Sequence, residues 1–225
     1  MKRDAGALVR LLQLASPALP VGAYSYSQGL EAAVEAGIVR DAPSAESWIG
    51  DVMALSLAAM EGPLLVRLMV AARDSDTAAL QRWNEEMLAS RESAELRAET
   101  VQMGYSLRRL LVELEVPGVA SLAGLEEISF PAAFAFAASA WKVDEEDALA
   151  AYLWSWLENQ VMAALKSVPL GQTDGQRVLM ALGSRIPDLA KQALQLGDDD
   201  LANFAPGLAI LSAHHETQYS RLFRS

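Results

Sequence analysis

The sequence predicts an all-α protein, a single domain over residues 1–225 built as a bundle of roughly eight to ten helices. Alanine and leucine, both strong helix formers, account for 40 and 34 of the 225 residues. Aromatic residues make up 7% of the chain and β-branched residues are also sparse, too few to fill a large sheet. Apolar residues recur at helical spacings with short breaks, and no internal repeat is present. A chain of this length can bury a sizeable core.

The N-terminal part is expected to hold helices separated by turn residues. A first helix over about residues 6–15 should end before Pro17, because proline disfavours the helical conformation in the residue that precedes it. A loop over residues 17–25 then leads into a helix over about residues 27–36. Ser44 is a candidate N-cap for the helix that follows.

The middle of the chain is expected to contain one interrupted helix and one long helix. Gly62-Pro63 should break or kink an otherwise continuous apolar pattern, and Asp76 can cap the next helix. From residue 92 to residue 113, apolar residues fall at spacings of three and four while charged residues occupy other faces, which predicts a long helix. The stretch 116–130 is rich in turn residues and is the best candidate for a loop and an internal hinge.

The next predicted helices begin at clear start signals. Pro131 suits the first position of a helix that runs through Trp141. Asp144 can cap a helix over residues 145–166. That helix should present one buried stripe, with two amide side chains at or beside it: Leu149, Tyr152, Leu153 and Trp156, then Asn159 and Gln160.

The last predicted helices lead into the C-terminal segment. Thr173 followed by Gln176 matches a capping box, which would open a helix that Pro187 should kink. The last helix should begin near Pro206 and run into residues 214–225.

Composition narrows the classes of partner. The net charge is -11, from 29 acidic and 18 basic residues, which disfavours nucleic acid and anionic membranes as partners. The absence of cysteine excludes disulfides and thiolate metal sites and fits a reducing compartment. Hydrophobic residues reach 52%, so some apolar surface is expected to face another protein.

A cytoplasmic location is expected. The longest apolar stretch, residues 52–72, is interrupted by Glu61, Gly62-Pro63 and Arg67, so it lacks the 18 to 20 uncharged residues of a typical membrane span. Residues 1–4 contain two basic side chains, but no clean signal-peptide pattern follows them.

The most informative segment is residues 214–225, because chain ends usually carry small polar residues and stay unordered unless something holds them. This segment instead carries Tyr219, Arg221, Phe223 and Arg224, and arginine and aromatic residues are enriched at binding hot spots. The pattern is typical of an end that docks on a partner. A last turn that folds back on the protein's own core would need the same residues.

An independent catalytic or metal site finds little support in the sequence. His214 and His215 are adjacent and would point about 100° apart on a helix, too far in direction to chelate one ion easily, so a hydrogen-bonded structural pair is favoured. Residues 171–176 lack the Lys-Ser or Lys-Thr of a phosphate-binding loop. Two alternatives stay open: a small helical enzyme that uses either histidine with a carboxylate or a serine, including those in residues 24–27, and a helical ligand-binding module.

Two predicted loops carry residues that could serve recognition or simply connect helices. Gly22 allows a positive φ and places Tyr24 at a helix entrance, where an exposed aromatic side chain can serve recognition. Tyr24 and Tyr26 could equally cover the end of the bundle. Residues 169–173 are typical of a tight connection between helices.

Four segments together resemble the UreF family of urease accessory proteins. They are residues 16–31, residues 92–107, residues 168–177 and the ending Arg221–Ser225, found in the order typical of the family. The resemblance covers nearly the whole chain from about Leu11 onward. Each segment alone is a weak signal, whereas the set is a strong one.

The resemblance implies an all-α, homodimeric protein that is not an enzyme and carries no cofactor of its own. Members of the family are expected to stand between the accessory protein UreD, also called UreH, and the nickel-carrying GTPase UreG. The assembly inserts nickel into apo-urease, and nickel and GTP are handled by the partner proteins. The metal would pass through a polar passage inside the complex.

The resemblance also implies partner-contact residues. Tyr24 is expected to contact UreG or UreD, and Arg221 is the best single candidate for recruitment. The N-terminal motif matches at Gly22, Tyr24, Ser25, Ser27, Gly29 and Glu31; the central motif at Lys166, Gln172 and Gln176; and the terminal motif at Arg221, Leu222, Phe223 and Ser225, with His215, Glu216, Tyr219 and Arg224 beside it. The central residues would lie on a polar path or at a dimer interface. Many relatives have a histidine where this chain has Ser129–Pro131, a departure that argues against nickel ligation there.

Overall fold

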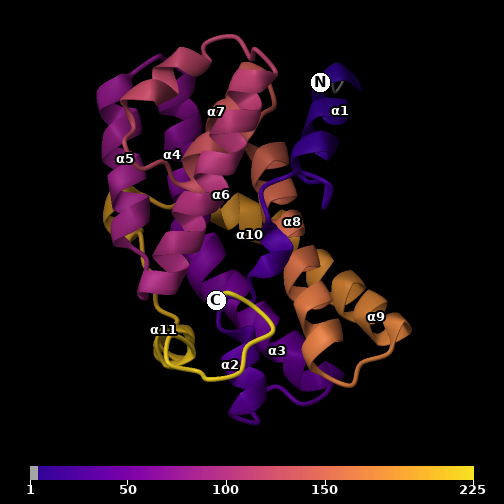
Figure 1. Ribbon diagram of the computed structural model, residues 1–225. Coiled ribbons are helices and arrows are strands. Elements are labelled where there is room, and N and C mark those ends of the chain that lie inside the picture. Colours follow the sequence, from indigo (N-terminus) through magenta and orange to yellow (C-terminus); the bar gives the residue numbers. More distant parts are fainter. Residues whose placement is uncertain (1–4) are drawn as a thin grey trace.

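The computed structural model describes residues 5–225, and over those residues it is helical with no β-strand (Figure 1). The α-helices are α1 (Ala5–Leu14), α2 (Leu30–Glu35), α3 (Ala42–Val52), α4 (Gly62–Arg73), α5 (Thr77–Ala89), α6 (Ala94–Glu113), α7 (Phe130–Ala140), α8 (Glu145–Ser167), α9 (Gln172–Gly183), α10 (Ile186–Gln195) and α11 (Pro206–His215). The other elements are the 3₁₀ turns η1 (Ala23–Ser25), η3 (Val119–Gly124) and η4 (Asp198–Asp200) and the π-helix η2 (Met53–Glu61). Because η2 joins α3 to α4, this part of the chain holds ten separate helices in a single all-α domain, which confirms the predicted fold class. The expectation drawn from residues 1–4 lies outside the described residues.

The helices form two halves that share α8. Helices α4, α5, α6 and α7 pack together at the upper left of Figure 1, with α7 between α4 and α6. Helix α8 runs down beside this group to α9, α3 and α2. Its stripe is buried as predicted: Leu149 and Tyr152 join the upper apolar cluster, and Leu153 and Trp156 join the lower one.

Gly62-Pro63 does not break the helix, which continues from Ala42 to Arg73. A kink at this point, the other predicted outcome, stays a prediction. Pro63 has no N–H and therefore cannot donate to the carbonyl of Ala59, four residues earlier. The structure compensates in two ways. The preceding turn is π-helical, and the backbone N–H of Ala202 donates to the Ala59 oxygen at 3.3 Å. Segments far apart in the sequence thus stabilise a proline inside a helix.

This long helix, residues 42–73, is also the one described helix that is long and apolar enough to cross a membrane by length and composition. Within the fold, 72% of its most apolar window is buried. A core helix of a soluble protein meets the same criterion, so the finding is weak evidence for a span.

Two predicted helix starts differ from the structure. The N-cap of α3 is Asp41, whose carboxylate accepts from the Ser44 backbone N–H at 3.0 Å, while the Ser44 hydroxyl accepts from the Asp41 N–H at 3.1 Å. Ser44 is therefore the N3 residue of a capping box, and Asp41 is its N-cap residue. Helix α9 begins at Gln172 without any side-chain cap, so the capping box predicted from Thr173 and Gln176 was wrong.

Prolines and carboxylates mark other helix starts. Pro187 lies in the first turn of α10, where its missing N–H costs nothing, so two helices replace the predicted kink. Pro131 is the second residue of α7, one position later than predicted, because the N-cap is Ser129 and the helix begins at Phe130. Asp76 and Asp144 cap α5 and α8 as predicted.

The segment predicted as a loop, residues 116–130, contains the short turn η3. Three of its apolar side chains, Leu122, Leu125 and Ile128, are buried in the upper cluster. Its role as a hinge stays a prediction.

Replacing Asp144 with alanine should lower the free energy of unfolding by about 1 kcal/mol. The Asp144 carboxylate accepts from the Asp147 N–H at 2.8 Å, and alanine leaves that donor to water. Denaturant unfolding of Asp144→Ala measures the loss. Asp144→Asn keeps an acceptor and should retain most of the stability; equal losses in both variants would show that capping is not the cause.

Candidate partner-docking site

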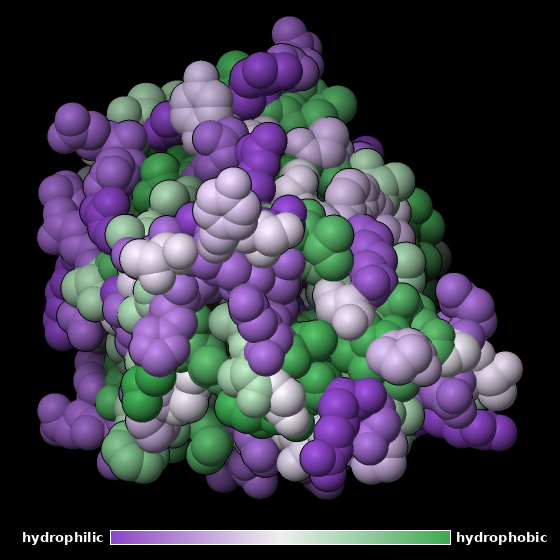
Figure 2. All heavy atoms as spheres, turned by 60° about the horizontal axis from the view of Figure 1, so that its bottom comes forward, coloured by the Kyte–Doolittle hydropathy of each residue, from purple (hydrophilic) through white to green (hydrophobic). Residues whose placement is uncertain are grey.

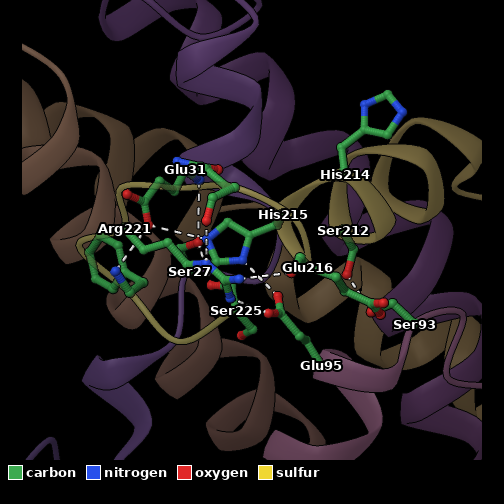
Figure 3. A network of polar contacts seen from close by, with 12 residues as sticks. Ser27, Glu31, Ser93, Glu95, Ser212, His214, His215, Glu216, Arg221 and Ser225 are labelled. Carbon is green, nitrogen blue, oxygen red and sulfur yellow. Dashed lines mark hydrogen bonds and ion pairs between the residues drawn. The ribbon is translucent and has the colours of Figure 1, made fainter.

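The C-terminal residues 216–225, called the tail from here on, fold back over the protein. Helix α11 ends at His215, and the tail continues without regular structure toward the loop before α2 (Figure 1). The last helix therefore begins at Pro206 and runs into the C-terminal segment 214–225, as predicted, and it ends at the second residue of that segment. Figure 3 shows the tail wrapped around a cluster of polar side chains from α2, α6 and α11. Three carboxylates hold it, those of Glu31, Glu95 and Glu99, which we call the anchor carboxylates.

Glu31 binds the tail through its backbone. Its Oε1 accepts from the Leu222 N–H at 2.7 Å and its Oε2 from the Phe223 N–H at 2.9 Å. Glu31 is buried in the first turn of α2, where a negative charge is favoured by the helix dipole. Gly29, in a left-handed conformation with φ 79°, turns the chain into that helix. One carboxylate thus satisfies two tail amides that would otherwise lack acceptors.

Phe223 adds an apolar contact at the same point. Its side chain is buried in the lower apolar cluster, and the ammonium nitrogen of Lys166 lies 5.5 Å from the centre of its ring. A cation in this position is attracted by the face of the ring. Lys166, predicted from the central motif, is therefore brought to the tail.

His215 connects the first two anchor carboxylates. Its ring is fully buried, with Nδ1 at 2.6 Å from Glu95 Oε2 and Nε2 at 3.3 Å from Glu31 Oε2. Arg221 Nη1 reaches the other oxygen of Glu95 at 2.5 Å, and the same guanidinium donates to the carbonyls of Glu216 and Gln218. Arg221 therefore closes the turn at the start of the tail.

The end of the tail is held by the loop before α2. The Ser225 carbonyl accepts from the Ser27 N–H at 2.7 Å, the Ser27 hydroxyl at 2.6 Å and the Gln28 N–H at 3.2 Å. The Arg224 N–H donates to the Ser25 carbonyl at 2.8 Å. The Ser225 hydroxyl donates to Glu99 on α6. The N-terminal and terminal motifs, about 200 residues apart, form one structural unit.

Glu99 lies beneath the end of the tail and is fully buried. It accepts a second hydrogen bond from the Gln28 amide, whose oxygen accepts from the Trp156 indole. Burial raises the pKa of Glu99 to about 7, while the hydrogen bonds from Ser225 and Gln28 act in the opposite direction.

The anchored tail presents two apolar side chains to solvent. Tyr219 is fully exposed and Leu222 is 72% exposed, although the adjacent Phe223 is buried. Figure 2 turns this end of the molecule forward and shows apolar areas between polar ones. Exposed aromatic and aliphatic side chains on a fixed backbone lose little conformational entropy when they bind. The geometry therefore suits docking of a partner protein.

Other predicted residues have mixed outcomes. Glu216 accepts from the Ala94 N–H at 2.8 Å and so ties the tail to the start of α6. Gly22 has the positive φ that its residue type allows, at 80°. Tyr24, about half exposed, donates to the Pro17 carbonyl at 2.5 Å. Gln172 and Gln176 are exposed on α9, and neither forms a hydrogen bond with the tail in the described part of the chain.

Two of the three anchor carboxylates, those of Glu95 and Glu99, were not predicted from the sequence as site residues. Glu95 and Glu99 are four residues apart on α6, so they face the same side of the helix. Both lie within the middle segment that carried the family resemblance. The spacing of four residues between these two glutamates was the sign available in the sequence. Carboxylates at the same spacing are also common on helix faces that are exposed to solvent.

A partly open cavity of about 260 Å³ lies behind the anchor. Its walls are mainly apolar, and Gln28, Glu99 and Trp156 line it. A buried ion pair also faces it: Arg91 Nη1 lies 2.7 Å from Glu61 Oε1, and Glu61 Oε2 accepts from the Tyr152 hydroxyl at 2.6 Å. The pKa of Tyr152 is raised, first by burial and then by the charge of Glu61.

The surroundings of the two histidines differ: His215 is buried between carboxylates and His214 is exposed. Both ring nitrogens of His215 face carboxylates, and His214 is exposed on α11. Within residues 5–225, no hydrogen bond joins a serine to either histidine, and no group of three His, Cys, Asp or Glu is arranged to hold a metal ion. Ser212 pairs with Ser93 instead.

The fold and the anchor carboxylates place the chain in one class of protein, the all-α proteins whose C-terminal tail is docked on their own surface. The UreF family model matches residues 39–183. Curated relatives match almost the whole chain. The urease accessory protein UreF of Azoarcus sp. (strain BH72) is 59% identical over 97% of this chain and 95% of its own, and that of Dechloromonas aromatica (strain RCB) is 56% identical over 97% of each. The chain belongs to the UreF family of urease accessory proteins.

Proposed function

We propose that the protein is a non-catalytic, cytoplasmic and homodimeric scaffold of urease maturation. It would bridge UreD and the GTPase UreG and so assist nickel insertion into apo-urease. It would need no cofactor of its own, because nickel and GTP are handled by its partners. Neither nucleic acid nor a membrane is a proposed partner.

The anchored tail is the observation that carries this proposal. Anchor carboxylates, a buried phenylalanine and backbone hydrogen bonds fix the tail, yet Tyr219 and Leu222 project outward. A tail that served only the core would bury its aromatic side chains. The fixed backbone with exposed apolar groups is what a docking surface requires.

Arg221 then has a positioning role in recruitment. Its guanidinium binds Glu95 and two tail carbonyls, so it shapes the turn that presents Tyr219. Tyr24, in the loop next to the end of the tail, is proposed to extend the same surface.

Arg221→Ala and Tyr219→Ala should both abolish co-purification with UreG in the presence of UreD, for different reasons. Arg221→Ala removes the turn, whereas Tyr219→Ala removes a contact that the isolated protein does not use. Tyr219→Ala should therefore keep the wild-type melting temperature. Met180→Ala, at another exposed apolar side chain on α9, is the matched control and should retain recruitment. Recruitment that survives Arg221→Ala and removal of the last ten residues would eliminate the tail from the mechanism.

A further inference from the structure

The end of the tail and the carboxyl of Glu99 bury each other. The Ser225 hydroxyl donates to Glu99 Oε2, and the Ser225 carbonyl takes three donors from Ser27 and Gln28. Gln28 also donates to Glu99 Oε1 through its side chain. The tail cannot leave this position without opening Glu99 to water.

We propose that Glu99 is a proton-linked latch: the tail docks more firmly when Glu99 carries a proton and loosens when the proton leaves. The latch is a property of the isolated chain. It stands or falls separately from the scaffold function proposed above.

The hydrogen bonds around Glu99 fit either protonation state. As a carboxylate, Glu99 accepts from the Ser225 hydroxyl and the Gln28 amide. As an acid, it can still accept from Gln28 on one oxygen and donate its own proton to the Ser225 oxygen, because a hydroxyl both donates and accepts. Protonation therefore breaks no contact with the tail.

The titratable and charged groups around Glu99 come from five other segments. Glu61 at the end of η2 and Arg91 after α5 oppose each other and form an ion pair. Tyr152 on α8 and Tyr26 in the loop before α2 each feel the negative charge of Glu99, and Arg224 of the tail binds Tyr26. On α6 itself, Glu95 is committed to His215 and Arg221. No cation in this set is bonded to Glu99, so burial dominates.

The direction of the coupling follows from what docking replaces. In the undocked chain, water donates to the carboxylate as well as the Ser225 hydroxyl does, and it also solvates the charge. Docking keeps the hydrogen bond but removes the solvation, which disfavours the charged form. The docked state therefore holds the proton more tightly than the undocked state.

The cavity behind the anchor supplies the route for the proton. Glu99 lines this partly open space of about 260 Å³, together with Gln28 and Arg91. A space of this size is large enough to admit water molecules beside polar groups. Glu99 can therefore exchange its proton with solvent while the tail stays docked.

The raised pKa fixes the pH window. Burial raises the pKa of docked Glu99 from its ordinary 4.5 to about 7. The contribution of Glu99 to docking should be greatest below pH 4.5, weaken by up to about tenfold per pH unit as the pH rises toward 7, and approach a constant value above pH 7.

Hydrogen exchange of the Arg224 amide tests the latch, because that N–H donates to Ser25 only when the tail is docked. After correction for the intrinsic pH dependence of exchange, its protection in the wild type should fall about fifteenfold between pH 5.5 and 7 and then level off over the next pH unit. In Glu99→Gln, which keeps both hydrogen bonds but cannot titrate, protection should not depend on pH.

Glu158→Gln is the matched control. Burial raises the pKa of Glu158 as well, but within residues 5–225 Glu158 forms no hydrogen bond or ion pair with the tail, so this variant should keep the wild-type profile. Flat protection in the wild type, the opposite slope, or a slope that persists in Glu99→Gln would overturn the latch.

A second measurement needs no Glu99 variant. Carboxyl carbon NMR of Glu99 should titrate near pH 7 in the wild type and at lower pH in Phe223→Ala, which removes the buried anchor of the tail. An unchanged pKa in Phe223→Ala, with the tail shown to be undocked, would also overturn the proposal.

Discussion

Replacing Glu31 with alanine should release the tail from the body of the protein and abolish recruitment of UreG. Glu31 accepts from the backbone of Leu222 and Phe223 and faces buried His215. Each amide left buried without an acceptor would cost about 1–3 kcal/mol, so the tail should leave and hydrate them instead. Loss of hydrogen-exchange protection at both amides measures the release, and co-purification in the presence of UreD measures recruitment.

Glu35→Ala is the control for this variant. Glu35 is an exposed carboxylate on the same short helix α2, so its replacement changes the charge equally without touching the tail. It should match the wild type in both measurements. A protected tail in Glu31→Ala would show that the apolar contact of Phe223 suffices for docking.

Among the glycines between residues 22 and 207, Gly104 should tolerate alanine least. A Cβ at residue 104 would lie 2.1 Å from the Ile128 carbonyl oxygen and 2.6 Å from the Ser129 carbonyl carbon. Both are backbone atoms of the segment that enters α7, so no side chain can rotate away. We expect a loss of about 4 kcal/mol, which lowers the melting temperature by roughly 10 °C in a protein of this size.

Gly124→Ala separates steric clash from the general effect of replacing a glycine. Nothing lies within 4 Å of a Cβ at residue 124, and its φ is not in the left-handed region. Thermal unfolding should leave this variant within about 2 °C of the wild type. A similar result for Gly104→Ala would mean that the segment before α7 can move without cost.

The sequence predicted those parts of the fold that depend on local rules. Helical spacing identified α6, and carboxylates before apolar runs identified the caps Asp76 and Asp144, because a cap needs only its own next turn. Gly62-Pro63 does not break the helix, for a reason that is not local. The carbonyl that proline leaves free is satisfied by Ala202, about 140 residues later.

The candidate site shows the same division. The aromatic and basic residues of the tail pointed to an end that docks, and the family resemblance added Glu31 and Ser27. Nothing local could show that Glu99 would accept from Ser225, since these residues are 126 positions apart. The sequence also left open whether the tail meets a partner or its own core. In the structure Phe223 packs into the core while Tyr219 faces solvent. The tail therefore folds back on the core through one side chain and leaves another free to contact a partner.

We propose that the docked tail is the surface through which this protein serves urease maturation. The most direct test is nickel loading of urease in cells that express the complete urease operon with the wild type, Glu31→Ala or Glu35→Ala in place. The account predicts nickel-loaded urease with the wild type and Glu35→Ala, and apo-urease without bound UreG with Glu31→Ala. Full nickel loading with Glu31→Ala, its tail shown to be released, would contradict it.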